Sequence, residues 1–331
     1  MVWNKGVIME FFKYTKSFNF MGKSKKAMYL SILLVIMSYV LVFTKGINYG
    51  VDFTGGTLIQ VKYDKVAPIK NIREKLKTNK LFKNATIVEF GSPEEIVIRM
   101  KTTTSDISVD IGDLTRESLK DTGKFDVRRV DIIGPTVGAE LKEKGIMSLL
   151  LATFGILIYV AFRFEWRFAV ASIFALIHDI SLAIGAITLV QLEVNLDVLA
   201  ALLTILGYSL NDTIIVFDRI REGIVKTKKT DFFSIINESI TKTLSRTTLT
   251  SLTTFFVVFT LFMFGGEIIH PFAFTLLIGI VVGTYSSIFI ASPTLIYFGF
   301  NVREYNTKLA DKAKRAAEKD RMRSQFETGV L

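Results

Sequence analysis

The chain has 331 residues, half of them hydrophobic, and a formal net charge of +10. This composition is too apolar for an ordinary soluble domain, and the length is sufficient for several membrane spans and one compact domain. The absence of cysteine excludes disulfides, a thiol nucleophile and cysteine-ligated metal sites, and the two histidines are too few for a His-rich metal site. We therefore expect neither a metal nor a cofactor.

Six hydrophobic segments approach or exceed the ~20 residues that a helix needs to cross the hydrocarbon layer. They are residues 27–44, 146–163, 167–190, 197–217, 248–265 and 271–298. The first follows a long basic stretch and precedes no small-residue cleavage site, so we expect an anchor rather than a cleaved signal. The predicted divisions are a cytoplasmic segment 1–26, a first span 27–45, an outside domain 46–143, a five-helix bundle 144–298 with a cytoplasmic loop 218–247, and a basic tail 299–331.

The distribution of Lys and Arg predicts the orientation. Residues 1–26 hold six basic groups against one acidic, residues 218–247 seven against four, and the tail eight against five. The loops "QLEVNLD" and "GGEIIH" contain no Lys or Arg. By the positive-inside rule, both termini are expected on the cytoplasmic side, and the net charge reports topology rather than nucleic-acid binding.

The outside segment 46–143 is predicted to be a small α+β domain. The stretches "GTLIQVKY", "ATIVEF", "EEIVIRM" and "FDVRRVDII" favour strands, whereas "APIKNIREKLKTNK" and "DISVDIGDLTRESLKDT" favour helices. The resulting order βαββαβ is the ferredoxin-like arrangement. The tail "KLADKAKRAAEKDRMR" favours a solvated or interfacial helix.

Two turn motifs bound this domain. In "GVDFTGGT", Asp52 precedes Gly55 and Gly56, which can adopt backbone angles that a side chain forbids. In "IGPTVG", which holds Gly134, Pro135 and Gly138, the proline stops the last strand and directs the chain toward the second span. We interpret both motifs as hinges or tight turns, and simple connectors are the alternative.

Asp212 is the first ionisable residue that stands out within a predicted span. It lies about two turns inside the apolar part of "LTILGYSLNDTIIVFDRIRE", close to Tyr208, Ser209 and Asn211. A carboxylate near the bilayer centre costs roughly 2.5–3.5 kcal/mol on insertion scales and normally faces the protein interior. A functional role is therefore the leading hypothesis, and a purely structural carboxylate is the alternative.

Arg246 begins a polar stripe in "SRTTLTSLTTFF". Thr250 and Thr253 lie four and seven residues further on, so the three side chains share one helix face. Such a stripe can bond neighbouring helices or line a wetted path. Arg246 can extend to the cytoplasmic surface or reach inward toward Asp212, and the sequence leaves both open.

His178 and Asp179 lie in the third span, in "LIHD". Adjacent helical residues point about 100° apart, so we expect one of them to face the bundle and the other to bond locally. Asp218 is followed by Arg219 and Arg221 and is expected to be a helix-end charge at the water boundary.

These residues suggest a proton relay. Arg does not release a proton near neutral pH, so Asp212 is the expected carrier and Arg246 the fixed charge. Proton movement releases about 2.3 kcal/mol per charge per 100 mV. Gly279, Gly283, Ser287 and Ala291 recur every four residues and predict a smooth ridge for close helix approach.

The motifs "GVDFTGGT", "IGPTVGAEL", "LIHD", "GYSLNDTIIVFDRIRE" and "SRTTLTSLTT" resemble, in order and spacing, those of the SecF family. The resemblance implies a six-span, RND-type subunit of the bacterial inner membrane that uses the proton-motive force to assist protein export. In this family the intramembrane Asp of the fourth span corresponds to Asp212, and the Arg of the fifth span to Arg246. Asp179 and Asn211 are expected to belong to the same proton relay.

The implied partners are SecD, the SecYEG channel and YajC, with a preprotein as substrate and protons as the coupling ion. SecD would supply a further Asp that this chain lacks. Two alternatives remain: a proton-driven half-transporter that exports lipid or drug, and an intramembrane aspartyl protease using Asp179 and Asp212. Neither aspartate has the Gly-x-Gly-Asp context of such a protease, and no enzymatic activity is expected.

Overall fold

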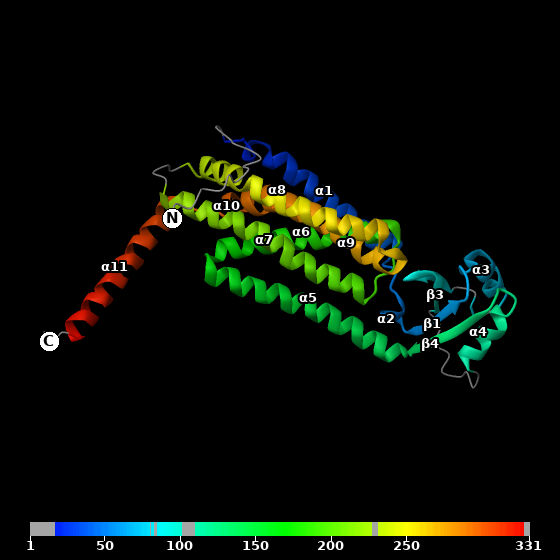
Figure 1. Cartoon of the computed structure of the whole chain (residues 1–331). Coiled ribbons are helices and arrows are strands. Elements are labelled where there is room, and N and C mark those ends of the chain that lie inside the picture. The colour runs from blue at the N-terminus through cyan, green and yellow to red at the C-terminus, as the bar shows by residue number, and fades with distance from the viewer. Residues whose placement is uncertain (1–16, 80, 83–84, 101–109, 227–230, 328–331) are drawn as a thin grey trace, which may run out of the picture.

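The structure is a computed structural model that describes residues 17–79, 81–82, 85–100, 110–226 and 231–327. Long helices lie side by side, a small sheet domain lies at one end of them, and a final helix projects from the other end (Figure 1). The predicted class, a multi-span helical membrane protein with a small α+β domain, is confirmed.

Six helical segments of the described chain are long and apolar enough to cross a membrane. They are α1 (Met21–Lys45), α5 (Pro135–Arg163), α6 (Trp166–Val190), α7 (Leu196–Lys226), α8 (Phe232–Phe264) and the run of α9 (Gly266–Ser286), the π-helical turn η1 (Ser287–Ala291) and α10 (Ser292–Tyr297). In α6, α7 and the α9 run, half or more of the most apolar stretch is buried, against 11% in α1 and α5. The helices α6, α7 and α9 therefore form the centre of the bundle.

The sheet domain contains β1 (Gly56–Tyr63), α3 (Ile69–Thr78), β2 (Thr86–Phe90), β3 (Ser92–Met100), α4 (Ile111–Leu119) and β4 (Phe125–Ile133). Its strands are antiparallel in the order β2-β3-β1-β4. This is the expected ferredoxin-like order. Ile59, Val61, Ile96 and Ile98 alternate along β1 and β3 and form a core with Ile72 of α3.

The turn motifs pack against one another where the domain meets the bundle. Residues of "GVDFTGGT" form the short helix α2 (Val51–Thr54), after which Gly55 and Gly56 have positive φ angles of 76° and 154°. A Cβ on Gly55 would lie 2.9 Å from Pro135 Cα, and one on Gly138 would lie 2.7 Å from Gly55 N. Glycine is therefore required for this close approach.

Two parts of the bundle differ from the expected divisions. α7 continues to Lys226 and α8 begins at Phe232, so most of the stretch 218–247 is helical rather than a loop. The polar residues of this stretch end the hydrophobic segments on either side of it, but they do not break the helices α7 and α8. The last span is interrupted by η1, which ends two residues before Pro293, because proline lacks the N–H that would continue an α-helical bond. The tail forms α11 (Val302–Glu327), as its composition predicted.

Candidate functional site

Asp212 lies inside the bundle on α7 and is 1% exposed. Its Oδ2 accepts hydrogen bonds from Ser251 Oγ of α8 at 3.1 Å and from Thr284 Oγ1 of α9 at 3.4 Å. The two hydroxyls lie 2.7 Å apart. Within the described chain, the donors recorded for this carboxylate are neutral hydroxyl groups from two neighbouring helices.

Asp179 on α6 occupies a second polar cluster and is fully buried. Its Oδ2 accepts from Ser209 Oγ of α7 at 2.5 Å and from Ser286 Oγ of α9 at 2.8 Å. Its Oδ1 lies 2.8 Å from His178 Nδ1. As expected, one residue of the pair, Asp179, faces the neighbouring helices, and the other, His178, bonds locally to it; both side chains are buried because α6 lies at the centre of the bundle.

The α9 helix connects the two clusters, since Thr284 bonds Asp212 and Ser286 bonds Asp179. Two glycines let α9 approach α7 closely: a Cβ on Gly279 would lie 2.2 Å from Ile205 Cγ1, and one on Gly283 would lie 3.0 Å from Ser209 Cβ. The predicted small-residue ridge therefore faces α7. Ser287, also predicted there, is buried at the start of η1.

Arg246 lies on the exposed side of α8, together with Thr250 and Thr253. The two threonine hydroxyls bond carbonyl groups of their own helix, including Arg246 O at 3.0 Å from Thr250 Oγ1. Asn211 is likewise exposed on α7. These four predicted residues are exposed on α7 and α8, whereas Asp212 and Asp179 lie within the bundle.

A groove of about 470 Å³ is lined by Arg246, Asp218, Arg163 and Lys242, among others. Asp218 Oδ1 lies 2.8 Å from Arg221 Nη2 and 3.5 Å from Arg163 Nη2. Its side chain is half exposed, but it is not the helix-end charge that was expected, because α7 continues eight residues beyond it to Lys226. In this structure Arg246 borders the groove and makes no recorded bond to Asp212 within the described chain.

Tyr208 and Ser209 were predicted to support Asp212, but the structure separates their roles. Ser209 bonds Asp179, not Asp212. The Tyr208 hydroxyl is buried and has no hydrogen-bond partner among the described residues. Sequence reasoning missed Ser251, Thr284 and Ser286, because hydroxyl residues are frequent in these spans and only helix rotation decides which of them point inward.

The sheet domain contacts the ends of the central helices through side chains. Asp52 Oδ2 accepts from Leu196 N at 3.0 Å, at the first residue of α7. Arg99 Nη1 on β3 pairs with Glu193 Oε2 at 3.1 Å, and both side chains are about 15% exposed. Glu267 Oε2, at the start of α9, accepts from Glu89 N at 3.1 Å. Two of the three helices that donate to the buried carboxylates, α7 and α9, are therefore joined at their ends to the sheet domain and the turn motif that precedes it.

Two observations concern an aspartyl protease dyad and a metal site as other possible chemistries of these residues. No hydrogen bond joins the Asp179 and Asp212 carboxylates in the described part of the chain, and each has its own hydroxyl partners. Among the same residues, no cluster of three or more potential metal ligands is found.

Comparisons with known proteins give consistent matches. A family model described as protein export membrane protein SecD/SecF, C-terminal, matches residues 114–301, and a model of the SecD/SecF GG motif matches residues 40–65. The chain is 46% identical over 323 residues to protein translocase subunit SecF of Helicobacter pylori, covering 98% of this chain and 100% of the relative. It is 48% identical over 301 residues to the SecF subunit of Calditerrivibrio nitroreducens, covering 89% and 98%.

Solved structures agree with these relatives. The chain is similar to the crystal structure of SecDF from Thermus thermophilus, described as a translocon-associated membrane protein, with a TM-score of 0.74 and 36% identity. The match covers 86% of this chain but only 39% of the SecDF chain. A structure of SecDF in a super-membrane-facing form matches with a TM-score of 0.66.

Proposed function

The chain belongs to the SecF family of protein translocase subunits, and on that premise we propose that it works with SecD to couple proton flow to preprotein movement. It is a multi-pass membrane component of the Sec export machinery and not an enzyme. The proposed location is the bacterial inner membrane with both termini cytoplasmic, which places the sheet domain on the export side. SecYEG, YajC and the preprotein are proposed partners.

The observation that carries the proton proposal is the environment of Asp212. An ionised carboxylate that contacts only neutral hydroxyls inside a membrane is costly, and taking up a proton removes that cost. Hydroxyl groups can donate to the ionised form or accept from the protonated form. A proton arriving at Asp212 therefore changes the hydrogen bonds that join α7 to α8 and α9.

The path from that change to the exported chain runs through the ends of the same helices. Asp52 bonds the first residue of α7, and Glu267 at the start of α9 bonds the edge strand β2. Arg99 and Glu193 add an ion pair that is mostly shielded from solvent. We propose that small movements of α7 and α9 shift the sheet domain against the emerging preprotein.

The exposed polar face of α7 and α8 is the proposed contact with SecD. Arg246, Thr250, Thr253 and Asn211 lie on the outside of this chain at the level of its spans. Exposure of such groups to lipid is unfavourable, so a partner membrane subunit is expected to cover them. SecD would bring its own acidic group to this face, where Arg246 is placed to act as the fixed charge.

Asp212→Asn tests the proposal in inverted vesicles that contain SecD and SecYEG. We expect SecD to co-purify normally, while the stimulation of preprotein movement by the membrane potential is lost. Asp197→Asn is the matched control, since Asp197 lies exposed near the start of the same helix. Normal potential-dependent export by Asp212→Asn would refute the proton role.

The proposed orientation has a direct test because the chain contains no cysteine. A membrane-impermeant maleimide applied outside spheroplasts is expected to label Glu117→Cys in the sheet domain and not Ala317→Cys in α11. The reverse pattern would contradict the orientation.

A further inference from the structure

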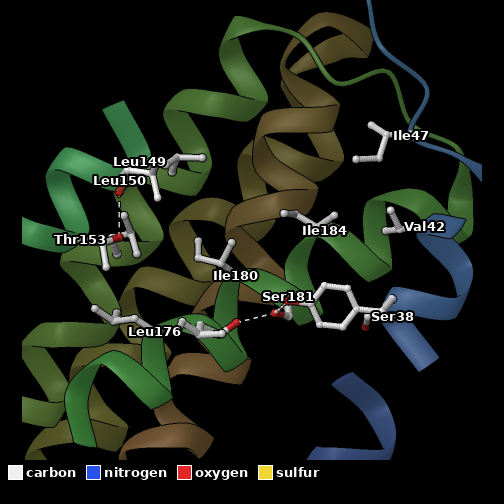
Figure 2. Close-up of a pocket in the computed structure, with 13 residues that line it drawn as sticks. Ser38, Val42, Ile47, Leu149, Leu150, Thr153, Leu176, Ile180, Ser181 and Ile184 are labelled. Carbon is white, nitrogen blue, oxygen red and sulfur yellow. Dashed lines mark hydrogen bonds between the residues drawn. The ribbon is translucent and has the colours of Figure 1, made fainter. Parts of the chain in front are cut away.

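An apolar groove of about 330 Å³ lies where α5 and α1 flank α6. Figure 2 shows Leu149, Leu150 and Thr153 on one side, Ser38 and Val42 of α1 on the other, and Ile180 and Ile184 of α6 between them. Tyr39 borders it and its hydroxyl lies 3.3 Å from Ser181 Oγ. The groove lies on the outer side of the bundle, since α1 and α5 are the least buried spans.

A second cavity of about 120 Å³ continues the groove toward the sheet domain and shares Ile47, Leu149 and Ile184 with it. Lys142 lines this second cavity, whereas Thr153 lines the first. Eleven helical steps separate these two α5 residues, or about 16.5 Å at 1.5 Å per residue. That length is about half of the ~30 Å hydrocarbon core, so the joined groove has the depth of one leaflet.

Two polar groups at the sheet-side end have no hydrogen bond or ion pair recorded among the described residues. Thr188 lines the second cavity, is 1% exposed, and its Oγ1 makes no hydrogen bond among the described residues. Lys142 Nζ lies 4.0 Å from the centre of the Tyr49 ring and has no recorded ion pair in the described chain. Lys144, two residues further along α5, instead pairs with Glu140 at 2.6 Å.

We propose that this joined groove binds one anionic phospholipid of the leaflet on the sheet-domain side. An acyl chain fills the apolar groove, the Thr188 hydroxyl donates to an ester carbonyl, and the Lys142 ammonium contacts the phosphate. Basic groups beside pockets between membrane helices are suited to anionic headgroups. The one-leaflet depth, the buried unpartnered hydroxyl and the charge at the mouth together select this occupant over a protein helix.

The test uses the full chain with SecD in phosphatidylcholine nanodiscs that contain a few per cent of phosphatidylglycerol bearing a photoreactive acyl chain. Cross-links are expected on α5 and α6 peptides that contain Leu149 and Ile184. Lys142→Gln should lower this labelling several-fold, and Thr188→Val, which keeps the side-chain shape, should lower it as well. Lys144→Gln is the matched control and should leave the labelling unchanged.

Several results would overturn the proposal. Equal labelling of these peptides by a phosphatidylcholine probe with the same photoreactive chain would mean that the headgroup is not recognised. An equal loss of labelling in Lys142→Gln and Lys144→Gln would mean the same. Labelling that occurs only without SecD would show that a protein covers the groove. Displacement of the probe by inorganic phosphate would indicate a free-anion site instead. None of these outcomes tests whether Asp212 gains and loses a proton, so the lipid proposal and the proton proposal fail separately.

Discussion

At the scale of single residues, hydroxyl side chains determine what the buried carboxylates contact. The sequence indicated Asp212 because a carboxylate in an apolar helix is conspicuous. It did not indicate Ser251, which lies directly after Thr250 and faces inward, whereas Thr250 faces outward. The helical spacing that grouped Arg246, Thr250 and Thr253 was correct, but spacing alone does not tell which way a shared face points.

The Asp179 cluster provides a prediction at this scale. We expect Ser286→Ala to lower the free energy of unfolding by about 1 kcal/mol, between the ~0.6 typical of bonds between membrane helices and the ~1.5–3 of bonds to charged groups. The double variant with Ser209→Ala should cost more than the sum of the single changes, because Oδ2 then loses both recorded donors.

Reversible unfolding in detergent micelles measures these differences. Ser148→Ala is the control, since that hydroxyl bonds only the exposed Lys144 carbonyl of its own helix in the described chain. A Ser286→Ala variant as stable as Ser148→Ala would exclude Ser286 as a significant anchor of Asp179.

At the scale of elements, strands were predicted more closely than helix ends. β1 and β4 match "GTLIQVKY" and "FDVRRVDII" residue for residue, because β-branched residues bounded by glycine or by charged turns mark a strand clearly. The ends of α7 and α8 were misjudged because hydrophobicity reports the lipid boundary and not the helix boundary. The π-helical turn η1 was also missed, since one proline does not reveal how a helix will accommodate it.

The close packing of α9 on α7 leads to a second prediction. Gly279→Ala should destabilise the protein by about 1–3 kcal/mol, because the added methyl would overlap Ile205 and force the helices apart. Gly207→Ala is a matched control, since its added methyl meets no atom within 4 Å. Combining Gly279→Ala with Ile205→Ala should restore part of the loss.

Thermal unfolding in micelles distinguishes the three variants. Equal melting temperatures for Gly279→Ala and Gly207→Ala would show that α9 does not depend on close approach to α7.

At the scale of the whole molecule, the arrangement joins two regions that the sequence presented as separate. The sequence predicted a small α+β domain bounded by turn motifs and indicated no contact between that domain and the bundle. Instead, Arg99 of β3 contacts Glu193, which lies between α6 and α7 and nearly a hundred residues later in the chain. An ion pair between residues so far apart in the chain depends on how the sheet domain is oriented on the bundle. Hydrophobic periodicity and turn residues do not encode that orientation.

This ion pair supplies the third prediction. Arg99→Gln should widen the distribution of distances between spin labels on the sheet domain and on α11, because the domain loses an anchor that is largely shielded from water. Arg116→Gln should leave the distribution unchanged, since Arg116 pairs with Asp113 on the exposed surface of α4. Identical distributions for the two variants would mean that Arg99 does not hold the domain.

The central claim is that the carboxyl group of Asp212 gains and loses a proton inside the bundle. Infrared difference spectroscopy of the chain with SecD, recorded as an imposed pH gradient is reversed, observes the carbonyl stretch of a protonated carboxylic acid directly. We predict a band that appears and disappears with the gradient, persists in Asp197→Asn and is missing in Asp212→Asn. An unchanged band in Asp212→Asn, or no band in the unmodified complex, would contradict the account.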